Sequence, residues 1–297
     1  MKTQSHLLPY FILASIVLSF LPIQNVWAES WLYRILLAGP SLFVPVGILF
    51  FADSALPLSQ NSIFSFISAL LLLLAAYCLP AGVTAAVLGI PWLLFVVALA
   101  LHVIRHQQQF PLAWILACCF LPVAAAWMFA DRLGWQPLGF DPLIVLLTGI
   151  HFHYAGFALA SVAALLPASK AQSYLSWGLL PGVAGVAIGI TNTQLGGPAV
   201  VEIVGVTTMV AVGIGIATLQ VRHAWLSQLP PIPRLLLTLG GIALAGGLSL
   251  ALLYGWRFHY QWNWLTIPWM YATHGLLNSL GFSLLSFTGH HLARYRQ

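Results

Sequence analysis

Long apolar stretches, each about the length of a membrane-spanning helix, follow one another through the whole chain. A helix needs roughly 20 apolar residues to cross about 30 Å of hydrocarbon. The apolar residues do not alternate with polar ones, as they do in the strands of a membrane β-barrel. The sequence therefore predicts an all-α, polytopic transmembrane helix bundle that forms a single integral membrane domain over residues 1–297. The ten expected spans are 7–24, 31–51, 61–79, 82–104, 111–130, 141–167, 174–192, 199–219, 233–254 and 263–288.

The scarcity of charge excludes several classes of protein. Only 5% of the 297 residues are Asp, Glu, Lys or Arg, against roughly 25% in a soluble globular domain. Hydrophobic residues make up 61%, so the surface of a soluble fold would be one continuous apolar patch. A soluble domain, a nucleic-acid-binding protein and a disordered chain are therefore excluded. The expected partners are membrane lipids and a hydrophobic small-molecule substrate, with no nucleic acid and an oligomeric state that is left open.

The basic residues indicate how the bundle is oriented, because cytoplasmic loops of membrane proteins carry an excess of Lys and Arg. When the loops are numbered alternately, one side carries Lys2, Arg105, Lys170, Arg222, Arg234, Arg294 and Arg296. The other side carries only Arg34, Arg132 and Arg257. We therefore expect both termini in the cytoplasm.

The first span has a second interpretation. Lys2, an apolar core and Val26-Trp27-Ala28 together resemble a secretory signal with a small-residue cleavage site. The core is about 17 residues long, which exceeds the roughly 7–15 residues of such signals. We therefore expect a retained helix, whereas cleavage would leave nine spans.

Few ionisable side chains are expected at bilayer depth, where each costs about 2.5–3.5 kcal/mol on insertion scales. The span 141–167 begins at Asp141 and contains His151, His153 and Tyr154. At 1.5 Å per residue, the two histidines lie about 15–18 Å from Asp141, close to the midplane. In a regular helix they point about 200° apart, which argues against a shared metal ion unless the helix is broken there.

The next two spans combine a row of glycines with two polar residues. Gly178, Gly182, Gly185 and Gly189 follow one another at spacings of 4, 3 and 4. Small residues on one helical face allow close packing against a partner helix. Asn192 continues the row, and Glu202 lies about one turn inside the following span. A buried carboxyl group such as Glu202 is suited to proton transfer, whereas a Glu that is hydrated at the helix end would be structural.

The last expected span carries His274, Asn278 and Gly281, which follow the i, i+4, i+7 spacing of one helical stripe. An Asn one turn from a His can fix the His tautomer through a hydrogen bond. We expect the last span and three earlier ones to enclose a polar pocket that opens to the outer leaflet or the periplasm. Its expected catalytic residues are His151, His153, Tyr154, Glu202 and His274, and its expected substrate-binding residues are Asn192, Asn278 and Asp141.

Two segments of the chain resemble the YndJ-like family of bacterial integral membrane proteins. They are His151-Phe152-His153-Tyr154-Ala155-Gly156-Phe157 and Thr273-His274-Gly275-Leu276-Leu277-Asn278-Ser279-Leu280-Gly281-Phe282, and the pair Asn192 and Glu202 fits the same pattern. The resemblance covers the last five expected spans and implies a protein of the bacterial cytoplasmic (inner) membrane. It supports the choice of site residues more than any activity.

Three functions fit these observations. The first is an intramembrane enzyme that uses His, Glu and Asn acid–base chemistry to cyclise, isomerise or hydrate a lipid-soluble substrate, such as an isoprenoid or a fatty chain. No cofactor motif is visible, so we expect neither a cofactor nor a metal for this enzyme. The second is a proton-coupled membrane transporter, although the two halves of the chain show no repeat of the kind that is common in transporters. The third is a non-catalytic or metal-binding membrane accessory protein.

Overall fold

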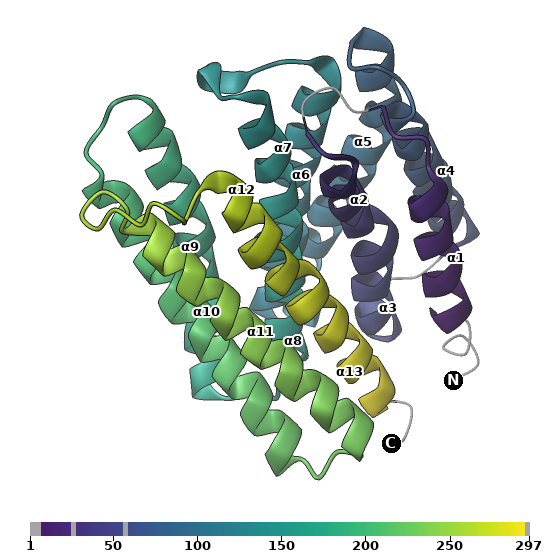
Figure 1. Ribbon diagram of the computed structural model, residues 1–297. Coiled ribbons are helices and arrows are strands. Elements are labelled where there is room, and N and C mark those ends of the chain that lie inside the picture. The colour runs from purple at the N-terminus through teal and green to yellow at the C-terminus, as the bar shows by residue number, and fades with distance from the viewer. Residues whose placement is uncertain (1–6, 25–27, 56–58, 295–297) are drawn as a thin grey trace. The chain divides into compact units, whose positions relative to one another are not determined.

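The computed structural model describes residues 7–24, 28–55 and 59–294, and every regular element among them is a helix (Figure 1). The all-α prediction is therefore confirmed for these residues. Lys2, Val26, Trp27 and Arg296 lie outside the described residues. The α-helices are α1 (Leu7–Phe20), α2 (Ser30–Ala38), α3 (Val44–Ala55), α4 (Gln60–Tyr77), α5 (Val83–Arg105), α6 (Leu112–Leu133), α7 (Pro142–His151), α8 (Leu159–Leu165), α9 (Lys170–Gln194), α10 (Val200–Leu226), α11 (Pro231–Gly255), α12 (Ile267–Met270) and α13 (Leu285–Arg294). The π-helices are η2 (Gly39–Phe43), η5 (Phe152–Ala158), η6 (Tyr271–Gly275) and η7 (Leu277–Leu284), and short 3-10 helices are η3 (Gln107–Gln109) and η4 (Pro137–Gly139).

Among the described residues, eight helical runs are long and apolar enough to cross a membrane. They are Ser30–Phe51, Gln60–Tyr77, Val83–Arg105, Leu112–Leu133, Pro142–Leu165, Lys170–Gln194, Val200–Leu226 and Pro231–Gly255. Each coincides with one of the expected spans, so the chain is a polytopic helical membrane protein. The expected spans 7–24 and 263–288 correspond to α1, which has 14 residues, and to a more polar helical run over 267–294.

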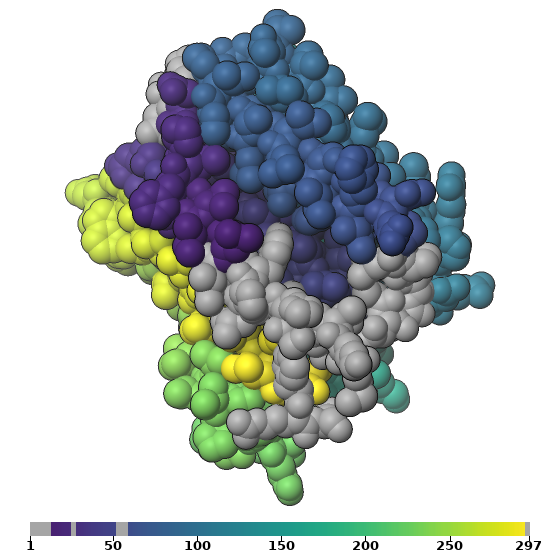
Figure 2. All heavy atoms as spheres, turned by 90° about the vertical axis from the view of Figure 1, so that its right-hand side faces the viewer, coloured from purple at the N-terminus to yellow at the C-terminus, as the bar shows by residue number. Residues whose placement is uncertain are grey.

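The chain forms two compact units. Unit 1 comprises residues 1–111 and 117–158, and unit 2 comprises residues 112–116 and 159–297. In unit 1, α4 and α5 pack side by side, and Figure 2 shows the surface over them in blue. Large apolar side chains such as Phe64, Leu71 and Leu94 are exposed there, which suits a face that lies against lipid.

In unit 2, α10 packs against α9 and α11, and the helical run 267–294 packs along α11 (Figure 1). The glycine row of α9 faces α10, as its spacing predicted. Gly178 meets Val212, Gly182 meets Met209, Gly185 meets Gly205 and Gly189 meets Glu202. A methyl group added at Gly189 would overlap the Glu202 backbone. The two backbones are therefore in direct contact because this face carries no side chains.

Candidate functional site

The expected site residues are divided between the two units. Asp141, His151, His153 and Tyr154 belong to unit 1, whereas Asn192, Glu202, His274 and Asn278 belong to unit 2. A pocket that all eight residues share therefore stays a prediction.

In unit 1, Tyr154 completes the hydrogen bonding of a helix that Pro40 disturbs. Proline has no N–H, so Pro40 cannot donate to the Leu36 carbonyl, and the Gly39 N–H donates to that carbonyl instead. In a regular α-helix the Gly39 N–H would donate to the Ile35 carbonyl. The Tyr154 hydroxyl donates to this Ile35 carbonyl at 2.8 Å. Tyr154 therefore has a structural role in satisfying the backbone.

His153 is also engaged with the backbone. It lies in the π-helix η5 and is 1% exposed. Its Nδ1 donates to the Gly149 carbonyl at 2.8 Å, which is the acceptor that the His153 backbone N–H would use in a regular α-helix. The ring lies against Gly39, where an added Cβ would come within 2.6 Å of Cδ2. Gly39 is therefore required for the close approach of this imidazole.

The regular-helix geometry that we assumed for His151 and His153 does not hold, because the helix changes to the π form directly after His151. His151 is half-buried, with its ring edge-on to Phe152 at 6.1 Å. Asp141 is exposed and caps the N-terminus of α7, where its carboxylate accepts the Leu143 N–H at 2.8 Å. Within unit 1, the expected site residues thus have visible structural partners.

A buried ion pair at the end of α6 escaped the sequence analysis. Arg132 Nε donates to Asp131 Oδ2 at 2.9 Å, and the two side chains are 0% and 1% exposed. The guanidinium also lies 4.2 Å from the centre of the Tyr77 ring and donates to the Leu79 carbonyl at 3.4 Å. The expected span ended at residue 130, one residue before this pair. Two adjacent opposite charges at the end of an apolar stretch were the signal.

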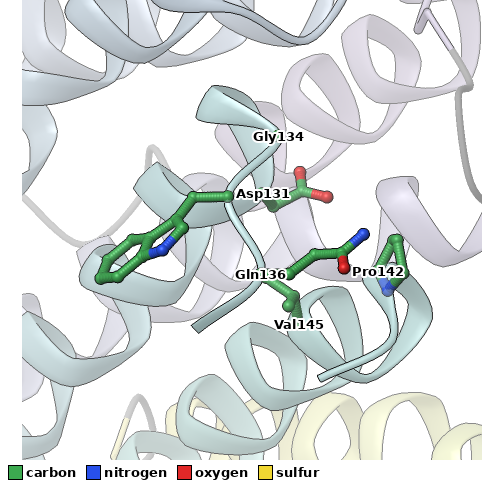
Figure 3. Close-up of a pocket in the computed structure, with 6 residues that line it drawn as sticks. Asp131, Gly134, Gln136, Pro142 and Val145 are labelled. Carbon is green, nitrogen blue, oxygen red and sulfur yellow. The ribbon is translucent and has the colours of Figure 1, made fainter. Parts of the chain in front are cut away.

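A small cavity lies beside this ion pair (Figure 3). It is lined by Asp131, Gly134, Trp135, Gln136, Pro142 and Val145. Figure 3 shows the Asp131 carboxylate and the Gln136 amide extending to the same side of the chain. Its volume of about 10 Å³ is close to the smallest that holds one water molecule, so it is too small for an organic substrate.

In unit 2, Glu202 is buried at 2% exposure, but it is paired with an arginine. Arg257 donates from Nη1 to Oε1 at 2.6 Å and from Nη2 to Oε2 at 3.3 Å. The guanidinium lies over the rings of Tyr254 and Phe258, at 4.3 and 4.2 Å from their centres. In the sequence Arg257 has the place of a loop charge, and nothing links it to Glu202, which it follows by 55 residues. Catalysis by Glu202 would therefore require this pair to open.

Asn192 closes the connection between α9 and α10. Its Nδ2 donates to the Pro198 carbonyl at 2.9 Å, and the Gly197 N–H donates to the Asn192 carbonyl at 2.8 Å. An added Cβ at Gly197 would overlap the Asn192 side chain. The visible role of Asn192 is to hold this turn.

His274 and Asn278 are in contact, as their spacing predicted. His274 Nδ1 lies 2.7 Å from the Gly247 carbonyl of α11, and a carbonyl only accepts, so Nδ1 carries the proton. Gly247 rather than Asn278 therefore fixes the tautomer. Asn278 Nδ2 donates to the His274 carbonyl at 2.9 Å and lies 3.3 Å from Nε2.

Further polar side chains continue from this contact along the run 267–294. Ser283 donates to the Asn278 carbonyl at 2.7 Å, and Ser286 accepts from Gln220 Nε2 at 2.9 Å. Ser283, Ser286 and Gln220 are all 0% exposed. His290 is 5% exposed, and its ring stacks on that of His223 at 6.0 Å. We call His274, Asn278, Ser283, Ser286, Gln220 and His290 the polar row.

The polar row is long enough to cover most of the thickness of a membrane. Residues 274 to 290 span at most about 24 Å along a helix axis, against about 30 Å of hydrocarbon. Gln220 Oε1 and His290 Nε2 are buried without a hydrogen-bond partner among the described residues. Gln220 escaped the sequence analysis because it follows the expected limit of its span at residue 219. Within the described part of the chain, no three His, Cys, Asp or Glu side chains are placed to share a metal ion.

Comparisons with known proteins place the chain in a family. The model of the YndJ-like protein family matches residues 34–282. The chain belongs to the YndJ-like family. A relative in this family, the uncharacterized membrane protein YndJ of Bacillus subtilis (strain 168), is 27% identical over 179 residues. The match covers 57% of this chain and 31% of the relative, so the chain spans less than a third of that protein's length. No solved structure matches the chain significantly.

The match with the YndJ-like family confirms the resemblance seen in the sequence. It also agrees with the helical structure in assigning the chain to the integral membrane proteins. All eight expected site residues and Gln220 lie inside the matched range, whereas His290 lies beyond it.

Proposed function

We propose that this YndJ-like protein is a proton-coupled membrane transporter and that the polar row of unit 2 carries the proton. The observation that supports this function is the line of buried hydroxyl, amide and imidazole groups along 267–294 and α10. Chains of polar and ionisable side chains within a membrane are typical of proton relays. In this assignment, His274 and His290 are the titratable ends of the relay.

Packing alone does not account for the polar row. The facing residues of α11 are small: Gly247 meets Asn278, Ala243 meets Gly281 and Gly240 meets Ser286. Alanine or serine on 267–294 would fill the same contacts without placing an amide in the membrane. A buried polar atom without a partner costs about 1–3 kcal/mol, and Gln220 Oε1 is such an atom. Proton transfer gives a reason for this cost, because a relay needs acceptors that exchange partners.

The proposal includes a topology for the row. With ten spans and both termini in the cytoplasm of a bacterial cell, the run 267–294 crosses from the outer to the inner face. His274 and Asn278 then lie on the outer half and are partly exposed, and His290 lies at the cytoplasmic end. The row would thus connect the two faces of the membrane.

A direct test follows proton entry into proteoliposomes that contain a pH-sensitive dye. An inward proton gradient is imposed, with and without a pool of small bacterial metabolites outside. We expect the wild type to dissipate the gradient faster than empty vesicles, and Gln220→Leu to lose this excess. Thr218→Val is the matched control, because Thr218 lies two residues away on α10 and is exposed. Among the described residues, its hydroxyl bonds only to the Ile214 carbonyl of its own helix. Proton entry that is equal in wild type and empty vesicles under both conditions would exclude the proposal.

An intramembrane enzyme is the second candidate, and the His274 site favours it. With the proton on Nδ1, the Nε2 lone pair of His274 can act as a general base once the Asn278 Nδ2, which lies 3.3 Å away, turns from it. The substrate would be a lipid-soluble isoprenoid or fatty chain that reaches the half-buried ring. Lipid extracts of cells that express the wild type or His274→Gln distinguish the two candidates. A lipid product that disappears in the variant, with unchanged proton entry in liposomes, would favour the enzyme.

A further inference from the structure

A second site lies in unit 2, at the end where α9 begins and α10 ends. A cavity of about 320 Å³ opens there, which falls in the range of roughly 300–1,000 Å³ that is typical of small-molecule sites. Part of its wall is apolar and consists of Leu166, Leu219 and Leu226. The polar part includes Ser169, Arg222 and His223.

We propose that this cavity binds a phosphate group, carried by a soluble phosphate or by a lipid headgroup. Ser169 caps α9 and accepts the Gln172 N–H at 3.1 Å, which leaves its own hydroxyl hydrogen free to donate. The first N–H groups of α9, near Ala171, have no partner within the helix and face an anion favourably. The Arg222 guanidinium adds the fork of donors that binds phosphate oxygens in pairs.

The charges of unit 2 support an anionic ligand. Glu202 is the one acidic residue in the sequence of this unit. It forms an ion pair with Arg257 at the end of α10 that lies away from the cavity. Residues 202 and 222 are about 30 Å apart along that helix. Arg222 is exposed and makes no ion pair or hydrogen bond within the described part of the chain. The positive charge at the cavity is therefore left for a ligand.

His223 gives the cavity a rigid wall. Ser227 Oγ lies 2.8 Å from His223 Nδ1, so the other ring nitrogen, Nε2, is left for a ligand. The His223 ring also stacks on His290, which is buried, lies nearly parallel at 13° and has an Nε2 without a partner among the described residues. Donors thus reach the cavity from α9 and from Arg222, and His223 adds a third when Ser227 donates to Nδ1 and the ring proton lies on Nε2. Three separate donor groups suit the oxygens of a phosphate better than the two oxygens of a carboxylate.

Binding measurements with two probes test the site and distinguish the source of the phosphate. Inorganic phosphate is titrated into the purified full chain in detergent by calorimetry. Phosphatidylglycerol binding is counted by native mass spectrometry of protein taken from nanodiscs that contain phosphatidylcholine with and without it. We expect Arg222→Gln to weaken binding of at least one probe by ten-fold or more. Arg105→Gln is the control, because Arg105 is also an exposed arginine but belongs to unit 1. This variant should leave the binding of both probes unchanged.

The binding results show whether the site exists and which kind of phosphate it takes. Loss of inorganic phosphate binding in Arg222→Gln assigns the site to soluble phosphates, and loss of phosphatidylglycerol binding alone assigns it to a lipid headgroup. The proposal is overturned if neither probe binds the wild type, or if Arg222→Gln and Arg105→Gln weaken binding equally. Because Arg222 is exposed, its variant should fold, and an unchanged elution volume and melting temperature check this. None of these results depends on proton transfer through the polar row.

Discussion

The two units use buried polar side chains in different ways. In unit 1, Tyr154 and Arg132 donate to backbone carbonyls that lack a helical partner, and Arg132 is 0% exposed. In unit 2, the Arg257 side chain of the Glu202 pair is 29% exposed, and Gln220 keeps an oxygen without a partner among the described residues. Asp131 Oδ1 and His153 Nε2 of unit 1 are also buried without a partner among the described residues. We infer from the backbone contacts that the polar groups of unit 1 complete the fold, whereas the proposed relay requires those of unit 2 to exchange partners. Substitutions should lower stability mostly in unit 1 and function mostly in unit 2.

The largest loss of stability is expected for Arg132→Met. This substitution leaves the buried Asp131 carboxylate without its partner, and breaking a buried pair on one side costs about 3–5 kcal/mol. Unfolding by SDS in mixed micelles measures the change. Arg105→Met is the control, because Arg105 is exposed at the end of α5. Equal losses in the two variants would contradict the structural role assigned to the Asp131–Arg132 pair.

Gly39→Ala should be the next most damaging change. The added methyl group would lie 2.6 Å from His153 Cδ2, and overpacking of this kind costs about 1–3 kcal/mol. Gly89→Ala in α5 is a matched control, because its added Cβ meets no atom within 4 Å among the residues that the structure describes. Thermal unfolding in detergent should show a lower melting temperature for the first variant only. A normal melting temperature for Gly39→Ala would mean that the contact between η2 and η5 is loose.

Tyr154→Phe is expected to cost about 1 kcal/mol, the usual net value of one hydrogen bond. The variant keeps the ring, which lies edge-on to Phe43 at 5.5 Å, and removes only the donor to the Ile35 carbonyl. Tyr174→Phe removes a hydroxyl from an exposed side chain of α9 and should be neutral. If Tyr154→Phe is neutral in the same SDS titration but abolishes a function, Tyr154 is a functional residue and unit 1 resembles unit 2.

The sequence predicted the helical class, eight of the spans, the partner-facing glycine row of α9 and the contact of His274 with Asn278. These features depend on local length, polarity and spacing, which one chain displays directly. The spacing also placed His151 and His153 on opposite faces of their helix, on the condition that the helix is regular there. That condition does not hold at His153, because the change to a π-helix accompanies a contact with Gly39, more than a hundred residues earlier.

The partners of buried charges were harder to predict for a related reason. Arg257 and Glu202 are separated by 55 residues, and nothing local marks them as a pair. Asp131 and Gln220 follow the expected limits of their spans by one residue, because hydropathy sets the limit at the first polar residue whereas the helices continue to Leu133 and Leu226. Helix boundaries are the least reliable part of such predictions. Polar residues near the end of a membrane helix need hydrogen-bond or ion-pair partners. They are thus the residues that a span assigned from hydropathy leaves out.

The smallest effect on stability is expected for Gln220→Leu, although this variant should have the largest effect on proton entry. Leucine removes the unpartnered Oε1 and fills a similar volume, which offsets the loss of the bonds to the Leu237 carbonyl and Ser286. Because removal of a polar atom without a partner is favourable by about as much as those bonds contribute, the free energy of unfolding should change by less than about 1 kcal/mol. Ser249→Ala on the exposed face of α11 serves as a second reference for the SDS titration. A loss of several kcal/mol would make Gln220 a structural residue like Arg132 and would remove the distinction between the two units.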